Sequence, residues 1–111
     1  MEATAKLRNY RTAPRKLRLL ADLVRTKPVG QAINELRFSQ KRGAKPLTKL
    51  IESAIANAVD KNPEVDVDRL RIKTITVDQG PNMWRIRARA QGRASWIQRR
   101  TTNVCVVLAE K

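Results

Sequence analysis

The chain has 111 residues and a formal net charge of +14, since 24 lysines and arginines face only 10 acidic residues. This length leaves room for one domain, and the single cysteine, Cys105, excludes a framework of internal disulfides and fits a reducing compartment. No apolar run reaches the roughly 18 residues of a membrane span, and a domain this basic binds nucleic acid at physiological salt, at least non-specifically.

The first predicted elements are a short strand and an amphipathic helix. Residues 3–10 alternate small or apolar side chains with polar ones and predict the strand. Thr12-Ala13-Pro14 predicts a helix start, with the threonine hydroxyl as the cap and the proline in the first turn. The buried face of this helix is predicted from an apolar stripe with helical spacing, which consists of Leu17, Leu20, Ala21 and Val24.

Two further helices follow. Lys27-Pro28 ends the first helix, and a short second one is indicated by Val29, Ala32, Ile33 and Leu36. The third helix has a longer and more regular stripe, formed by Leu47, Leu50, Ile51, Ala54, Ile55, Ala58 and Val59. The alanines in this stripe allow close approach, so we expect this helix to be central and packed on a sheet. Pro46 leaves two possibilities open: the helix begins near residues 42–45, or a turn from Ser39 onward is kinked at the proline.

Two more strands are predicted after Asn62-Pro63, which ends the third helix. Residues 70–77 are rich in Ile, Thr and Val, but their apolar phase slips between Ile72 and Ile75, which indicates a bulge or burial on both faces. Residues 103–108 form the last predicted strand. Cys105 lies there among aliphatic neighbours, and we expect a buried, inert thiol.

Between these strands lies a long basic segment. Residues 79–109 contain six arginines and no acid, with too few aliphatic side chains for a separate core. We expect residues 79–101 to form a β-hairpin arm that turns at Gln91-Gly92 and reaches roughly 35 Å, at about 3.3 Å per residue. Such an arm is suited to contact with a polyanion.

Strand alternation gives the arm two different faces. Arg85, Arg87 and Arg89 would share one face, where guanidinium groups suit phosphates. Trp84 would lie on the other face. Trp84 and Trp96 either stack on exposed bases or pack on each other, and the sequence favours neither possibility.

The sequence does not support catalysis. It contains no histidine, and its four glycines form no phosphate-binding loop. Asp66-Val67-Asp68 lacks the glycine and the closing glutamate of a calcium loop. We therefore expect no enzyme activity, no cofactor and no metal.

The first helix has a basic face without compensating acids, which favours contact with phosphates over an ordinary solvated surface. This face consists of Arg15, Lys16, Arg18 and Arg25. An alternative function is that of a helix-turn-helix DNA-binding regulator built from the first two helices. However, residues 29–38 offer few side chains for base edges, and the arm would have no role.

Three motifs together resemble one protein family. Residues 13–25, Ala-Pro-Arg-Lys-Leu-Arg-Leu-Leu-Ala-Asp-Leu-Val-Arg, are similar to the first-helix signature of the L-twenty-two family of large-subunit ribosomal proteins. Residues 52–58, Glu-Ser-Ala-Ile-Ala-Asn-Ala, resemble its central-helix motif. Residues 77–81, 85–86, 89–94 and 99–101 resemble its hairpin. The resemblance covers nearly the whole chain, with the motifs in the right order.

The resemblance implies an α+β fold, with three helices packed on a small three-stranded antiparallel sheet and a long basic β-hairpin extension. Residues 1–111 would be one ribosomal-protein domain with residues 79–101 as its arm. The implied protein is a structural constituent of the large subunit that binds rRNA, supports assembly and lines the nascent-peptide exit tunnel with its hairpin. It would be cytoplasmic and bound to the ribosome, with an organellar ribosome as the alternative location.

The implied partners are several domains of large-subunit rRNA, neighbouring large-subunit proteins and the nascent peptide, with no membrane and no homo-oligomer. The expected rRNA-binding residues are Arg11, Arg15, Lys16, Arg18, Arg25, Lys41, Arg42, Trp84, Arg85, Arg87, Arg89, Arg93, Arg99 and Arg100. The expected hairpin tip in the tunnel consists of Ala88, Arg89, Ala90, Gln91, Gly92 and Arg93.

Overall fold

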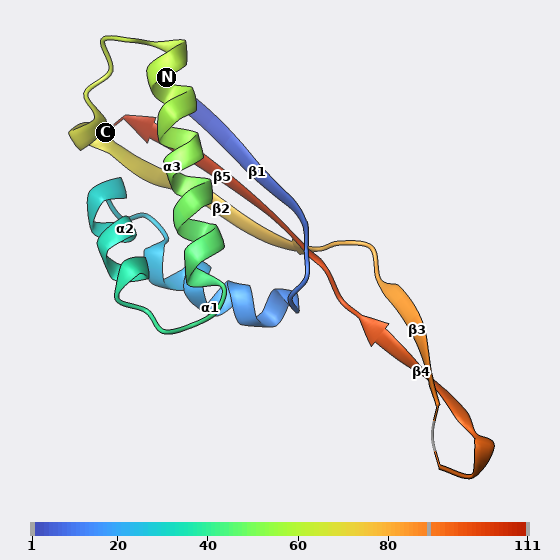
Figure 1. Ribbon diagram of the computed structural model, residues 1–111. Coiled ribbons are helices and arrows are strands. Elements are labelled where there is room, and N and C mark those ends of the chain that lie inside the picture. The colour runs from blue at the N-terminus through green and yellow to red at the C-terminus, as the bar shows by residue number, and fades with distance from the viewer. Residues whose placement is uncertain (1, 89, 111) are drawn as a thin grey trace.

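Three helices cover one face of a three-stranded antiparallel sheet, and a two-stranded hairpin projects from its end (Figure 1). The computed structural model describes residues 2–88 and 90–110. The helices are α1 (Pro14–Val24), α2 (Val29–Arg37) and α3 (Ala44–Lys61). The strands are β1 (Glu2–Tyr10), β2 (Leu70–Gln79), β3 (Met83–Ala88), β4 (Ala94–Arg99) and β5 (Thr102–Glu110). The α+β class with three helices on a three-stranded sheet is therefore confirmed.

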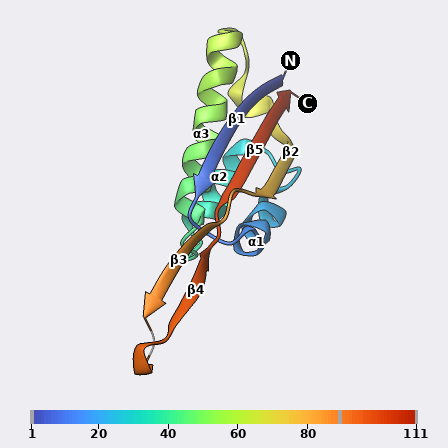
Figure 2. The same ribbon diagram turned by 90° about the vertical axis from the view of Figure 1, so that its right-hand side faces the viewer.

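The sheet has the order β1-β5-β2, and β3 pairs only with β4. Figure 2 shows β1, β5 and β2 side by side, with the arm at the end of the sheet opposite the start of β1. The molecule measures 65 × 26 × 16 Å along its principal axes, and its radius of gyration is 17.2 Å. A compact chain of this size would have about 13 Å. The excess comes from the arm, which lies outside the body formed by the helices and the three-stranded sheet.

The apolar stripes of the helices form the core of the body. All four predicted stripe residues of α1 are buried, and five of the seven predicted for α3 are buried as well. Ile55 is half-buried and Val59 is 41% exposed, so the expectation for Val59 was wrong. These two residues lie one turn apart on a flank of α3 that the sheet does not fully cover. Pro46 lies in the first turn of the helix, where its missing N–H removes no helical hydrogen bond.

The strands confirm the predicted bulge and correct the prediction for the cysteine. The pairing of β2 with β5 shifts register between Ile72 and Thr74, which is where the apolar phase slips. Cys105 is only partly buried, because its register places it opposite Lys6 and Thr76, on the face that the helices leave open. An antiparallel sheet often keeps one face in water in this way.

The start of α1 also differs from the prediction. Its N-cap residue is Ala13, and no side chain caps the helix. Thr12 does not use its hydroxyl as a cap; its backbone carbonyl instead accepts a hydrogen bond from the Thr102 hydroxyl. This bond connects the start of α1 to the start of β5.

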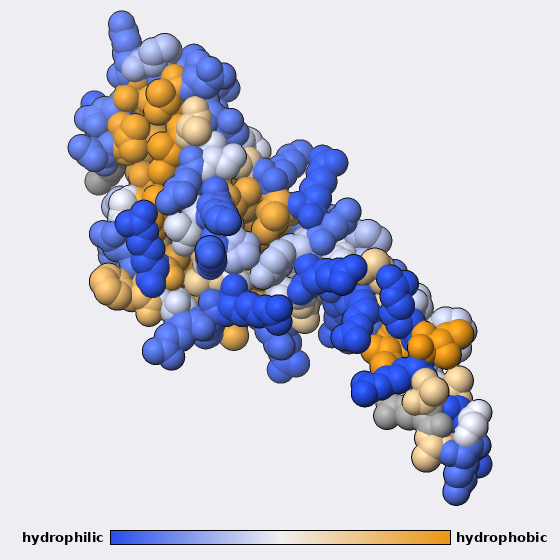
Figure 3. All heavy atoms as spheres, in the orientation of Figure 1, coloured by the Kyte–Doolittle hydropathy of each residue, from blue (hydrophilic) through white to orange (hydrophobic). Residues whose placement is uncertain are grey.

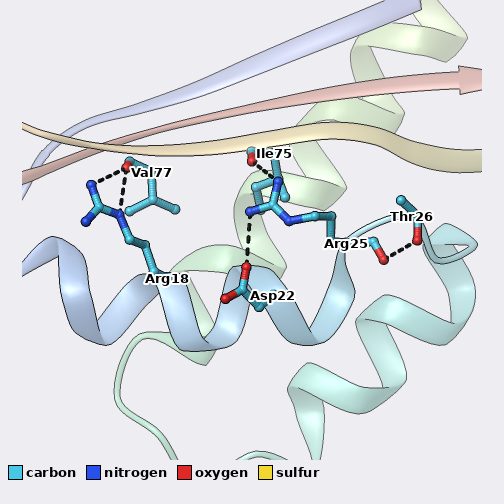
Figure 4. A network of polar contacts seen from close by, with 6 residues as sticks. All are labelled: Arg18, Asp22, Arg25, Thr26, Ile75 and Val77. Carbon is cyan, nitrogen blue, oxygen red and sulfur yellow. Dashed lines mark hydrogen bonds and ion pairs between the residues drawn. The ribbon is translucent and has the colours of Figure 1, made fainter.

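Side chains from the helices bond to the backbone of both outer strands of the sheet. Arg18 donates two hydrogen bonds to the Val77 carbonyl, at 3.2 and 3.1 Å, and Arg25 donates one to the Ile75 carbonyl at 2.8 Å (Figure 4). On the opposite edge, α3 provides the donors. There the Asn57 amide bonds to the Thr4 carbonyl and the Lys61 ammonium to the Glu2 carbonyl, each at 2.9 Å.

We expect Arg18→Gln to lower the free energy of unfolding by about 1 kcal/mol, because a pair of charge-assisted hydrogen bonds to β2 is lost. Arg15→Gln is the matched control, since Arg15 is exposed on the same helix. Urea denaturation of both variants measures the difference. Equal midpoints for the two variants would show that the bonds to Val77 do not stabilise the fold.

The arm leaves the body at a tight crossing of its two strands. The Gly80 N–H donates to the Thr101 carbonyl at 2.9 Å, and the Thr101 hydroxyl donates to the Pro81 carbonyl at 2.7 Å. A Cβ atom on Gly80 would lie 2.5 Å from the Thr101 hydroxyl oxygen, so this position requires glycine. At the far end, Gln91 and Gly92 have φ angles of 62° and 72°, which places the turn at the predicted dipeptide.

Candidate nucleic-acid interface

A strongly basic concave surface lies where the arm joins the body. It is a hollow of about 740 Å³ whose lining includes six cations and no acid. We call this surface the basic hollow. Its cationic side chains are Arg11, Lys16, Arg42, Arg85, Arg99 and Arg100. Figure 3 shows hydrophilic side chains crowded at this junction of body and arm.

Four separate parts of the chain build the basic hollow. Arg11 follows β1, Lys16 lies in the first turn of α1, and Arg42 precedes α3. The arm adds one arginine from β3 and two from the end of β4 and the residue after it. Two hydrogen bonds, between Thr102 and Thr12 and between Thr101 and Pro81, hold these segments together at the crossing where the arm leaves the body, which we call the neck.

The N-terminus of α1 adds to the positive potential at this place. Ala13, its N-cap residue, lines the basic hollow, and the first turn contains no acid. Pro14 has no N–H and the Lys16 N–H donates to the Ala13 carbonyl at 3.1 Å, so the helix start favours an anion mainly through the positive end of its dipole.

Basic surface continues on both sides of the basic hollow. A second hollow of about 270 Å³ is lined by Arg15, Arg18 and Arg100, and also by Gln98, which lines the basic hollow as well. A third of about 450 Å³ brings Lys41 beside Arg42. Neither lining contains an acid. The cations therefore form one continuous belt around the first turns of α1.

No acid lines any of these three hollows. Among the described residues, the ion pairs involve none of the six cations of the basic hollow. The pKa of Glu2 is lowered by a hydrogen bond from Lys73, and that of Glu35 by one from Lys27, and neither carboxyl lines the hollow. Four exposed acids follow one another near the α3–β2 connection, at the end of the body away from the arm (Figure 1): Asp60, Glu64, Asp66 and Asp68. An anionic partner would therefore be directed to the arm end of the molecule.

The two faces of the arm differ in chemistry. In the register of β3 and β4, Arg85 lies opposite Ile97 and Arg87 opposite Ser95, on one face. Trp96 lies opposite Ile86 on the other face, and Trp84 is its diagonal neighbour there. The two tryptophans are 55% and 65% exposed, so both rings keep a large free surface for stacking.

Comparison with known proteins decides the family. The model of the family described as ribosomal protein L22p/L17e matches residues 5–109. The chain belongs to this family. Its relatives include proteins named large ribosomal subunit protein uL22 from Myxococcus xanthus, Geotalea daltonii and Syntrophotalea carbinolica. They are 54%, 53% and 52% identical to the chain, over 99%, 100% and 100% of its length and 97%, 99% and 100% of theirs.

Membership of the L22p/L17e family confirms the resemblance and makes the chain a ribosomal protein and not an enzyme. In residues 2–88 and 90–110, no cluster of three or more histidine, cysteine, aspartate or glutamate side chains could hold a metal ion. No helix in the same part of the chain is both long and apolar enough to cross a membrane.

The structure distributes the predicted rRNA-binding residues of this L22p/L17e protein over three places. The basic hollow brings six of them together, and Arg15 and Lys41 flank it. Trp84, Arg87 and Arg93 lie exposed along the arm. Arg89 lies outside the described residues, and of the predicted tip the structure describes Ala88, Ala90, Gln91, Gly92 and Arg93.

Arg18 and Arg25 differ from the other predicted residues. Their guanidinium groups bond to carbonyls of β2, and Arg25 also forms an ion pair with Asp22 at 3.2 Å. Met83 and Gln98 also line the basic hollow beside the arginines. Sequence reasoning placed Met83 on the arginine face of the arm without naming it as a binding residue, and it missed Gln98. The alternation of the arm places Met83 with Arg85, but only the pairing register brings Gln98 to the same junction.

Proposed function

We propose that the chain is a structural constituent of the large ribosomal subunit and binds large-subunit rRNA through the basic hollow and the arm. The observation that carries this proposal is the hollow itself, where six cations from four segments meet without an acid. Uncompensated cations at one concave place repel each other unless a polyanion neutralises them. The names of the relatives supply the location in the large subunit.

The shape of the molecule supports contact with several rRNA domains. The hydrophobic core lies in the body, and none of the described residues between Val77 and Val104 belongs to it. The arm therefore needs other partners to hold it along its length, and its arginines and exposed tryptophans suit RNA backbone and bases. Neighbouring large-subunit proteins would contact the remaining surface of the body, and the protein supports assembly by joining these parts.

We further propose that the tip around Gln91 lines the nascent-peptide exit tunnel and that the protein acts in the cytoplasm, bound to the ribosome. This rests on membership of the family and on the arm geometry, because the turn at Gln91 and Gly92 is the part farthest from the body along the 65 Å axis (Figure 1). Residues 1–111 would act as one domain with residues 79–101 as its arm.

Sedimentation tests the proposed ribosomal function, and crosslinking tests the proposed position of the arm tip in the tunnel. The tagged chain should stay with the large subunit on a sucrose gradient after a high-salt wash. A photo-crosslinking residue at Gln91 should then capture an arrested nascent peptide, whereas the same group at Arg69, an exposed residue on the body, should not. Release to the top of the gradient would refute the ribosomal function. Retention without a crosslink at Gln91 would refute only the tunnel position.

A further inference from the structure

A second basic groove lies on the body, between β1 and the first half of α3. It has a volume of about 610 Å³, within the range of small-ligand sites. We call it the β1–α3 groove. Four cations line it and no acid does: Lys6, Arg42, Lys45 and Lys49. Arg42 also lines the basic hollow, so the two surfaces are continuous.

The floor of the β1–α3 groove is apolar and contains one aromatic ring. Leu7, Tyr10, Pro46 and Leu50 line it together with the cations. Leu7 and Tyr10 are partly buried and pack against the core, so the ring is held in place from behind. A held ring beside a free space is suited to stacking a planar group.

A bulge in β1 brings the tyrosine to this place. Between Leu7 and Tyr10 the strand has one residue more than β5 opposite, where Leu7 pairs with Val104 and Tyr10 with Thr102. In a regular strand Leu7 and Tyr10 would point to opposite faces, and the extra residue turns both toward α3. Asn9 has a φ of 58° in the bulge, and its N–H donates to the Asn103 side chain at 3.0 Å. The backbone therefore adopts an uncommon conformation whose effect is to aim Tyr10 into the groove.

The lysines on the other wall have no ion-pair partner in the part of the chain that the structure describes. Lys45 and Lys49 are one turn apart on α3, are both exposed, and take part in none of the ion pairs of the described residues. Like charges at this spacing destabilise a helix. The first turn of α3 has no acid and no side-chain cap, so these two ammonium groups and the helix start together favour an anion.

We propose that the β1–α3 groove holds one unstacked nucleotide of single-stranded rRNA, with its base on the Tyr10 ring and its flanking phosphates on Lys45, Lys49 and Arg42. This inference rests on the proposed binding of rRNA and adds a site to it. A duplex keeps its bases stacked inside and offers only phosphates, so it would leave the ring and the apolar floor of the groove unused.

Binding of oligo(A) RNA of about 12 nucleotides and of an RNA duplex of the same length tests the site. Tyr10→Leu should weaken binding of the single strand by about tenfold with an unchanged salt slope, since a stacking contact is lost and no charge is removed. Tyr10→Phe should retain the affinity. Lys45→Gln/Lys49→Gln should lower the salt slope on the single strand by roughly 1.4. Tyr10→Leu should not change binding of the duplex.

A crosslinking measurement on the unaltered protein is independent of the folding of the variants. Oligonucleotides containing 5-iodouridine should crosslink to Tyr10 on irradiation, as mass spectrometry of the digested complex would show. The inference would be overturned if Tyr10→Leu bound the single strand with the affinity of the wild type. It would also be overturned if the oligonucleotide crosslinked only to residues outside the groove. If Arg85→Gln/Arg99→Gln also binds like the wild type, the proposed rRNA function fails with it. If that variant loses affinity while the groove variants do not, only the nucleotide site fails.

Discussion

Replacing Arg85 and Arg99 with glutamine is expected to weaken binding to large-subunit rRNA by about a hundredfold at roughly 0.1 M salt. Each phosphate contact contributes about a factor of ten under these conditions, and the logarithmic salt slope should fall by roughly 1.8 for two contacts on duplex-like RNA. Both side chains are exposed and line the basic hollow from the arm, outside the core, so the body should keep its stability.

Arg69→Gln/Arg71→Gln is the matched control for this variant. It removes the same charge, also from exposed arginines, but near the acidic end of the body. Binding titrations at several salt concentrations measure both the affinity and the slope. If the control loses as much affinity as the Arg85/Arg99 variant, net charge and not the basic hollow determines binding, and the proposed interface is wrong.

Ala54→Leu is expected to lower the free energy of unfolding by about 1–3 kcal/mol, because it adds volume where α3 meets the sheet. Ala54 is completely buried on the helix that packs on β1 and β5. The midpoint of thermal unfolding should fall by roughly 4–8 °C for each kcal/mol in a domain of about this size.

Ala56→Leu makes the same chemical change on the exposed side of the same helix and should leave the midpoint nearly unchanged. Calorimetry of the two variants and the wild type gives the comparison. An Ala54→Leu protein as stable as Ala56→Leu would mean that α3 and the sheet are not in close contact at this residue.

The sequence allowed the helices and the core to be predicted because helical periodicity is a local signal. The stripe of α3 from Leu47 to Ala58 was recognised from spacing alone, and the phase slip at Ile72 and Ile75 correctly indicated a bulge. The predictions that were wrong depended on distant neighbours. Whether Cys105 is buried depends on which face of the sheet the helices cover, and the spacing within one strand does not contain that information.

The candidate site was predicted residue by residue but not as a surface. Basic composition pointed to most of the cations, yet their meeting in one hollow depends on the neck, where Thr101 and Thr102 bond across the chain. Arg18 and Arg15 look alike in the sequence, and only the position of β2 shows that Arg18 bonds to the backbone. The bulge at Asn9 has no glycine to indicate it, so the direction of Tyr10 could not be predicted.

The hydrogen bonds from the helices to the outer strands have a consequence for the free chain before it is assembled into a ribosome. A newly made copy that is not yet part of a ribosome has to remain in solution, and an open strand edge is the usual starting point for pairing between identical chains. Here Arg18 and Arg25 occupy carbonyls on one edge, and Asn57 and Lys61 occupy carbonyls on the other. These bonds therefore hinder edge-to-edge pairing between copies of the chain. Three of the four side chains, Arg18, Arg25 and Lys61, are also positively charged, and this charge repels other free copies.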